Sequence, residues 1–150
     1  MDKKTLNIAL GGDHAGYELK EKVKALLSSL GHSFTDYGPG SSESADYPDH
    51  VHPLADAVAA GDYDYGIVMC GSGNGVSMTA NKHPGIRAGL SWKPEIARLA
   101  RAHNDANVLA MPARFIDEKD AMDAVRLFLD TPFEGGRHQK RVSKISSRKV

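Results

Sequence analysis

Five short apolar runs alternate with segments of helical periodicity, and this alternation constrains the fold more than any other feature of the sequence. The apolar runs are expected as strands at residues 5–10, 33–37, 65–69, 86–90 and 107–111. Apolar residues recur every three or four positions elsewhere, which predicts helices at residues 19–30, 49–60, 73–82, 94–103 and 117–129. Strands that alternate with helices favour a parallel sheet with helices on both faces. The 150 residues contain no internal repeat and no linker, so we expect one domain over residues 1–150.

Glycine and proline mark the expected helix ends. Gly31 follows the first helical pattern, in the position where glycine commonly ends a helix. Pro53 is expected in the first turn of the second helix, because an interior proline has no N–H for the helical hydrogen bond. The tail from Glu134 is polar and basic, with Val142 and Ile145 as its expected apolar anchors.

The charge balance excludes several classes of partner. Lysine plus arginine and aspartate plus glutamate number 19 each, so no net field would attract nucleic acid or a membrane surface. No run approaches the roughly 18 apolar residues of a membrane span, and the apolar run near the N-terminus is too short for a signal peptide. The single cysteine excludes an intramolecular disulfide. These features fit a reducing compartment, and we expect a cytoplasmic protein.

The sharpest chemical signal is the segment CGSGNG at residues 70–75, directly after the third apolar run. Its glycines let the backbone approach a ligand, and it leads into a predicted helix whose N-terminus favours negative charge. Cys70 is therefore a candidate thiolate, able to act as a base or as a nucleophile. The backbone amides could hold an enediolate oxyanion. A buried structural cysteine before a tight turn is the alternative interpretation.

Candidate acid, base and anion-binding groups occur at other element ends. Asp13 and His14 follow the first strand, at the sheet edge where parallel sheets bind ligands. His14 could bind phosphate or a sugar hydroxyl, whereas Asp13 could equally be a helix N-cap. His103 ends the fourth helix, where the helix dipole alone favours a histidine, but it is also a good general acid or base near neutral pH.

A basic cluster lies near the C-terminus. Arg137 and Arg141 are four residues apart and would share one face of a helix. Together with His138 they could clamp a phosphate, for which arginine has the bidentate geometry. A solvated basic tail is the alternative interpretation. The Gly135-Gly136 hinge and the apolar anchors of the tail favour docking of this helix.

Other kinds of site lack the residues that they require. His50 and His52 have His-x-His spacing, but no third ligand at metal spacing accompanies them, so we expect no metal site and no cofactor. Residues 70–75 lack the Gly-Lys-Ser/Thr ending of a nucleotide P-loop. Residues 11–16 depart from the Gly-x-Gly-x-x-Gly pattern of dinucleotide sites.

Seven motifs, taken together and in order, resemble the ribose/galactose isomerase family, and within it the type B ribose-5-phosphate isomerases. They are GDHAG at residues 12–16, DYP at 46–48, CGSGNG at 70–75, ANK at 80–82, GIRA at 85–88, HND at 103–105 and GGRHQ at 135–139. The resemblance implies a Rossmann-like, three-layer α/β/α sandwich with a five-stranded parallel sheet. It also implies a homodimer or a dimer of dimers, with the C-terminal basic helix docked on the partner subunit and active sites shared across the interface.

The resemblance also implies a role for each matching residue. Cys70 would be the base that moves a proton between C1 and C2 of the sugar, and His103 would help to open the sugar ring. Ser72 and the amides of residues 71–75 would hold the enediolate oxygen. The other implied contacts are those of Asp13, Tyr47 and Asn104 with the sugar, of Gly71, Gly73, Asn74 and Gly75 with the enediolate, and of His14, Arg114, Arg137 and Arg141 with the phosphate.

Two departures from the family pattern bear on the chemistry. Many members have Thr where this chain has Ser72, and both residues supply a hydroxyl. A sister group lacks the cysteine and has a glutamate base at the position of Val76, so this chain keeps the thiol chemistry. The expected reaction is aldose–ketose isomerisation of D-ribose 5-phosphate and D-ribulose 5-phosphate through an enediolate. Two alternatives stay open: the same reaction on a hexose 6-phosphate or tetrose phosphate, and a sugar-phosphate sensor without catalysis.

Overall fold

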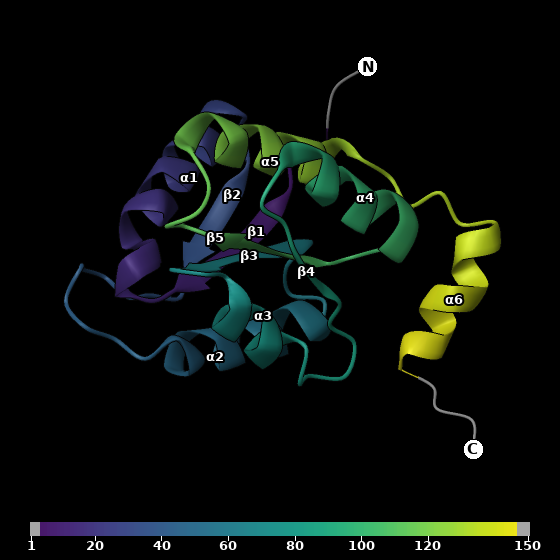
Figure 1. Ribbon diagram of the computed structural model, residues 1–150, viewed down its shortest axis with the longest axis horizontal. Helices are drawn as coiled ribbons and strands as arrows, with labels where there is room; N and C mark the ends of the chain where they lie inside the picture. The colour runs from purple at the N-terminus through teal and green to yellow at the C-terminus, as the bar shows by residue number, and fades with distance from the viewer. Residues whose placement is uncertain (1–3, 147–150) are drawn as a thin grey trace.

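A computed structural model describes residues 4–146, which form a five-stranded parallel sheet with helices on both faces (Figure 1). The strands are β1 Asn7–Gly12, β2 Ser33–Asp36, β3 Tyr65–Cys70, β4 Ala88–Leu90 and β5 Val108–Pro112, in the spatial order β2-β1-β3-β5-β4. The helices are the 3-10 turn η1 His14–Gly16, then α1 Tyr17–Ser29, α2 Tyr47–Ala59, α3 Asn74–Ala80, α4 Pro94–Asn104, α5 Glu118–Asp130 and α6 Arg137–Ile145. The predicted α/β/α architecture is confirmed, while the expected domain limits at residues 1 and 150 lie outside the described residues. Within residues 4–146, no helix is both long and apolar enough to cross a bilayer.

Two apolar layers hold the helices to the sheet. Helices α1, α4 and α5 cover one face, where Phe128 is fully buried, and α2 and α3 cover the other, around Leu54 (Figure 1). Successive residues of the central strand β3 point to opposite faces, so Met69 enters the first layer, whereas Val68 and Cys70 enter the second. The cysteine side chain therefore lies on the side of the sheet that α2 and α3 cover.

Proline and glycine positions test the predicted helix ends. Gly31 ends α1 as predicted, with a φ of 82° in the left-handed region. The prediction for Pro53 is wrong: α2 begins at Tyr47 with Pro48 in its first turn, so Pro53 lies in the helix interior. Pro53 has no N–H to donate to the carbonyl of Asp49, but both residues lie on the exposed side of the helix, where water can replace the missing donor.

β4 is shorter than the strand predicted at residues 86–90. The side chain of Asn107 replaces the first part of the ladder, because it accepts from the N–H of Arg87 at 2.8 Å and donates to the carbonyl of Gly85 at 2.8 Å. Strand pairing therefore begins at Ala88, opposite Val108. The other predicted strand and helix boundaries agree with the observed ones to within two residues.

Helix α6 stands apart from the sandwich, beside the last turn of α4 (Figure 1). His138 and Val142 of α6 are buried, so Val142 anchors the helix as predicted. Ile145, the other predicted anchor, is 60% exposed. Ile145 is thus not a buried anchor in the single chain, although it lines an open cavity together with Arg87 and Asn104.

Candidate active site

Cys70 lies at the carboxyl end of the central strand, where its side chain is 4% exposed. Its carbonyl accepts from the N–H of Ala113 at 2.9 Å, and that of Gly71 accepts from the N–H of Arg114 at 3.0 Å. These bonds tie the segment after β5 to the glycine-rich loop. The side chain of Arg114 lies over Gly71, where a Cβ would be 3.4 Å from its Nη1. A candidate phosphate-binding guanidinium therefore covers the residue that follows the candidate base.

The turn after β1 packs against the residue that precedes the cysteine. A Cβ at Gly12 or Gly16 would lie 2.0 or 2.4 Å from the carbonyl oxygen of Met69, so only glycine permits this approach. Asp13 caps the turn, as its structural interpretation predicted, because its Oδ1 accepts from two N–H groups at 2.9 and 3.2 Å. Asp13 is thus positioned beside the end of β3 with its carboxylate held by the backbone.

The segment before α2 and the start of that helix hold two further candidates. The N–H of Ala45 donates to Nδ1 of His14 at 3.2 Å. Nδ1 of His14 also lies 3.4 Å from the carbonyl oxygen of Ala45, so the backbone of Ala45 can hold this side of the ring in either tautomer. The ring of Tyr47 lies against Gly75, where a Cβ would be 2.3 Å from Cζ and 2.5 Å from the hydroxyl oxygen. The tyrosine hydroxyl therefore lies at the first turn of α3.

The glycine-rich loop turns into α3 at Gly73, whose φ is 78°. A Cβ there would lie 2.5 Å from Cδ1 of Leu90 and 3.0 Å from the backbone of β5, so both conformation and space require glycine. The hydroxyl of Ser72 accepts from the N–H of Asn74 at 3.2 Å, so this amide already has an acceptor. Val76 is fully buried under α3. The position that carries a glutamate in the sister group thus faces the apolar core in this chain.

The other candidates lie at the opposite end of the sheet. Helix α4, which carries His103 in its last turn, ends just before β5 begins at Val108. Cys70 pairs with Pro112, at the far end of β5. The two ends of β5 are about 13 Å apart, from four steps of about 3.3 Å, and Figure 1 shows α4 and α6 meeting at the end of the sheet away from the start of α3. One chain therefore does not bring Cys70 and His103 together.

His103 forms a compact cluster with α6 and the segment before it. Its ring stacks on His138, with centroids 4.1 Å apart and planes at 14°. Oε1 of Glu134 lies 3.9 Å from Nε2 of His103 and 3.5 Å from Nε2 of His138. Burial, together with the charges of His103, Arg137 and Arg141, lowers the pKa of His138, against the opposing effect of Glu134. This basic cluster suits an anionic ligand.

Two arginines hold the turn after α4. Asp105 has a φ of 48°, and its carboxylate accepts from Arg87 at 3.2 Å and from Arg101 at 2.9 Å. Asn104 lines a cavity of about 310 Å³ together with Arg87. The sequence analysis did not single out Glu134, Arg87 or Arg101. Arg87 lies within the GIRA motif at residues 85–88, and Glu134 directly precedes the GGRHQ motif at residues 135–139. Their places in or beside these motifs could have identified them.

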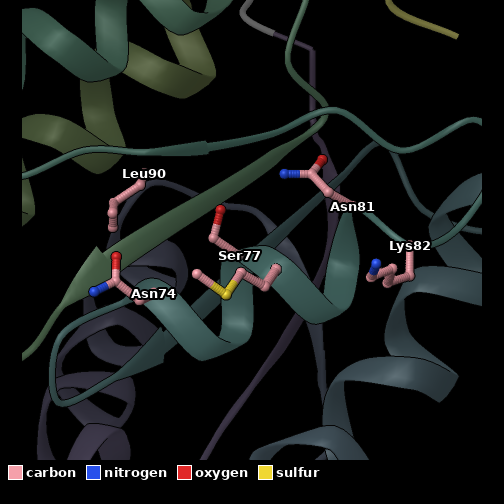
Figure 2. Close-up of a pocket in the computed structure, with 6 residues that line it drawn as sticks. Asn74, Ser77, Asn81, Lys82 and Leu90 are labelled. Atoms are coloured by element: carbon pink, nitrogen blue, oxygen red, sulfur yellow. The ribbon is translucent and has the colours of Figure 1, made fainter.

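A pocket of about 360 Å³ runs along α3, between this helix and β4 (Figure 2). Its lining residues are Asn74, Ser77, Met78, Asn81, Lys82 and Leu90. Asn74 belongs to the glycine-rich loop, so the pocket extends the surface around Cys70 along the helix. Met78 is 66% exposed, which leaves an apolar side chain on this open surface.

Comparisons with known proteins show the family of this chain. A family model described as Ribose/Galactose Isomerase matches residues 8–145. The chain belongs to this family. The matched range spans both the Cys70 loop and α6.

Members of the family include close relatives of this chain. Ribose-5-phosphate isomerase B of Escherichia coli strain K12 is 45% identical over 140 residues, which cover 93% of this chain and 94% of that protein. A ribose 5-phosphate isomerase of Thermotoga maritima has a TM-score of 0.93 and 46% identity, over 97% of this chain and all (100%) of the other. Ribose-5-phosphate isomerase B of Mycoplasma genitalium, solved with bound ribulose-5-phosphate, has a TM-score of 0.89 and 40% identity, over 95% of each chain.

Proposed function

We propose that this chain, as one domain over residues 1–150, interconverts D-ribose 5-phosphate and D-ribulose 5-phosphate. The enzyme is an aldose–ketose isomerase, as its relatives are. The substrate is supported by the relatives named ribose-5-phosphate isomerase B, one of which was solved with ribulose-5-phosphate. The observation that carries the chemistry of this chain is the buried thiol of Cys70 at the mouth of the glycine-rich loop. A cytoplasmic location stays a prediction.

Cys70 is the proposed proton-transfer base. Its thiolate takes the proton from C2 of the open-chain aldose, and the electron pair moves onto the C1 carbonyl oxygen to give the enediolate. A proton then passes from the C2 hydroxyl to the C1 oxygen, and the thiol returns its proton to C1, which gives the ketose. The negative oxygen of the enediolate is held by the hydroxyl of Ser72 and by amides of the loop. The N–H of Asn74 already donates to Ser72, so the amides of Gly71, Gly73 and Gly75 are the better donors to this oxygen.

Two chains are proposed to complete each active site. Cys70 lies beside the last residue of β5, and His103 lies shortly before its first residue. The separation of about 13 Å between these two ends of β5 supports a homodimer, either alone or paired into a dimer of dimers. One chain would supply the base and loop together with Asp13, His14, Tyr47 and Arg114. Its partner would supply His103 for ring opening, Asn104 for sugar hydroxyls, and Arg137, His138 and Arg141 of the docked α6 for the phosphate.

The reaction is tested with ribose 5-phosphate as substrate, in buffer with and without a chelator. We expect isomerisation in both buffers, and exchange of the C2 proton with solvent. Cys70→Ala is expected to abolish the exchange while the protein stays folded, whereas near-normal turnover by this variant would contradict the role of the thiol. Parallel assays with hexose 6-phosphates and tetrose phosphates test the substrate. Binding of sugar phosphates without proton exchange would instead identify a sensor.

Sharing of the site is tested by mixing two inactive variants, Cys70→Ala and His103→Ala. If the two residues reach one site from different chains, each mixed dimer contains one intact site. Random exchange of equal amounts then restores about a quarter of the wild-type sites, since half of the dimers are mixed and each has one active site of two. No recovery after exchange has been verified by mass spectrometry would refute the shared site.

A further inference from the structure

α2 and the segment between α3 and β4 bring two histidines and an aspartate together, outside the candidate active site. Nδ1 of His52 lies 2.7 Å from Nε2 of His83, and Nδ1 of His83 lies 2.9 Å from Oδ1 of Asp56. The two imidazole rings have centroids 4.9 Å apart and planes at 53°. The sequence suggested His50 as the neighbour of His52, whereas the fold supplies a histidine from a different segment.

The hydrogen bond to the carboxylate fixes which nitrogen of His83 has a lone pair. When Nδ1–H of His83 donates to Asp56, the Nε2 of the neutral ring is unprotonated and accepts from Nδ1–H of His52. Binding of a metal ion through these two nitrogens therefore requires His52 to move its proton to Nε2. Metal-binding histidines commonly donate their second ring N–H to a carboxylate, which orients the ring and makes it a better ligand. Asp56 would thus orient His83 through this hydrogen bond without contacting the metal ion itself.

The charges around His52 favour a cation. Asp49 and Asp56 lie three residues before and four residues after it on α2, so all three share one exposed side of the helix. Lys82, next to His83 in the chain, is exposed and can extend its ammonium into solvent. Negative charge therefore lies on the helix that carries the first histidine.

A second histidine cluster is less suited to a metal. In the part of the chain that the structure describes, the ligand atoms of His103, Glu134 and His138 lie within 4.8 Å of one another. The two rings, however, are stacked with planes at 14° and centroids 4.1 Å apart, so their nitrogen lone pairs lie in separate, nearly parallel planes and do not converge on one point. Arg137 and Arg141 add positive charge to this cluster, as their effect on the pKa of His138 shows. An anion suits it better than a cation.

His50, the histidine nearest to His52 in the sequence, makes a different hydrogen bond. His50 Nδ1 lies 2.8 Å from the carbonyl oxygen of Tyr37 and so donates to it. His50 therefore fixes the segment after β2 to α2, and it provides a matched control for a site that uses His52.

We propose that His52 and His83 bind a divalent transition-metal ion of the Zn²⁺ class, through Nδ1 of His52 and Nε2 of His83. Metal–nitrogen bonds of about 2.0–2.1 Å in tetrahedral geometry place the two nitrogens about 3.3 Å apart. From the observed 2.7 Å the two nitrogens need to separate by about 0.6 Å, and the rings need to turn so that both lone pairs point at the ion. The exposed His52 side chain permits this movement. Water completes the coordination, and the ion joins α2 to the α3–β4 segment. This inference does not depend on the proposed function.

Isothermal titration calorimetry with Zn²⁺, on the full chain freed of metal by a chelator, tests the site. We expect His52→Gln and His83→Gln each to lower the affinity at least tenfold, and Asp56→Asn to lower it about 10–100-fold, as outer-shell substitutions do. His50→Gln is expected to leave the Zn²⁺ affinity unchanged. Because ligand binding stabilises the folded state, Zn²⁺ should raise the Tm of the wild type and of His50→Gln, but not that of His52→Gln.

Three outcomes would overturn the proposal. One is the absence of binding over the micromolar range. Another is unchanged affinity in His52→Gln and His83→Gln. The last is loss of binding only in His138→Gln, which would place the ion in the stacked cluster. Nitrogen-15 chemical shifts of the histidine rings with and without Zn²⁺ give a second readout if His83→Gln destabilises the fold. None of these measurements uses isomerase activity, so failure of the metal site and failure of the proposed function are distinguishable.

Discussion

Replacing Gly73 by alanine tests whether the loop that follows Cys70 depends on glycine at its turn into α3. Two independent costs apply to this substitution. The φ of 78° is a left-handed conformation, which costs an L-residue roughly 1–2 kcal/mol. The new Cβ would also lie 2.5 Å from Cδ1 of Leu90 and 3.1 Å or less from the backbone at Met111 and Pro112.

The second cost, the steric clash of the new Cβ, is comparable with the cost of inserting an extra methyl group into a packed core. Such insertions cost about 1–3 kcal/mol, because neighbours must leave their preferred positions. Leu90 can rotate, but the backbone of β5 is held in the sheet, so part of this cost cannot be relieved. The sum predicts that Gly73→Ala lowers the free energy of unfolding by about 2–5 kcal/mol. That is a large fraction of the 5–15 kcal/mol typical of a domain.

Gly31→Ala is the matched control. Gly31 has a φ of 82°, but a Cβ there would meet nothing within 4 Å. Only the conformational cost of about 1–2 kcal/mol applies to it. Urea unfolding of both variants, followed by circular dichroism, measures the two changes. Equal losses of stability in the two variants would show that the close approach at Gly73 has no energetic effect and would refute the reasoning.

Three further predictions follow from contacts elsewhere. In Gly75→Ala the new Cβ would lie 2.3 Å from the ring of Tyr47, so we expect displacement of the ring and a lower kcat with a nearly unchanged urea midpoint; an unchanged kcat would contradict this. Lys20→Met removes a fully buried ammonium that donates to Asp36 at 2.8 Å, and urea unfolding should show a loss of about 1–3 kcal/mol. Burial and neighbouring positive charge lower the pKa of His138 in the folded protein, so the unfolded state binds the proton more readily. Stability should therefore fall as the pH drops below about 6.5, and His138→Gln should flatten this dependence in urea titrations from pH 5 to 8.

The layers and strands were predictable because local periodicity encodes them. The strand order β2-β1-β3-β5-β4 was not, since it depends on which strands pair across the sheet. The position of Pro53 was mispredicted from a general rule on interior prolines, and Tyr47 and Pro48 at the true helix start override that rule. The short β4 could not be predicted because the amide of Asn107, from another segment, replaces its first hydrogen bonds.

The candidate site, like the fold, could be predicted from the sequence only where local patterns determine it. Residues next to strand ends, such as Cys70 and Asp13, could be found because parallel strands end at one edge of the sheet. The pairing of His52 with His83 could not, because 31 residues separate them and only the packing of α2 against the α3–β4 segment joins them. Sequence spacing therefore identifies motifs of neighbouring residues, but not side chains that are distant in the sequence and adjacent in the fold.

The connection between a parallel strand and its helix explains why the proposed base and the proposed ring-opening histidine lie apart in one chain. A helix that links two parallel strands must return the chain to the edge of the sheet where strands begin. Cys70 ends a strand, whereas His103 ends such a return helix, so the topology assigns them to opposite edges. An active site that uses both residues therefore requires a second chain, whose helix end faces the strand end of the first. Because the two chains are identical, a two-fold axis then produces two equal sites.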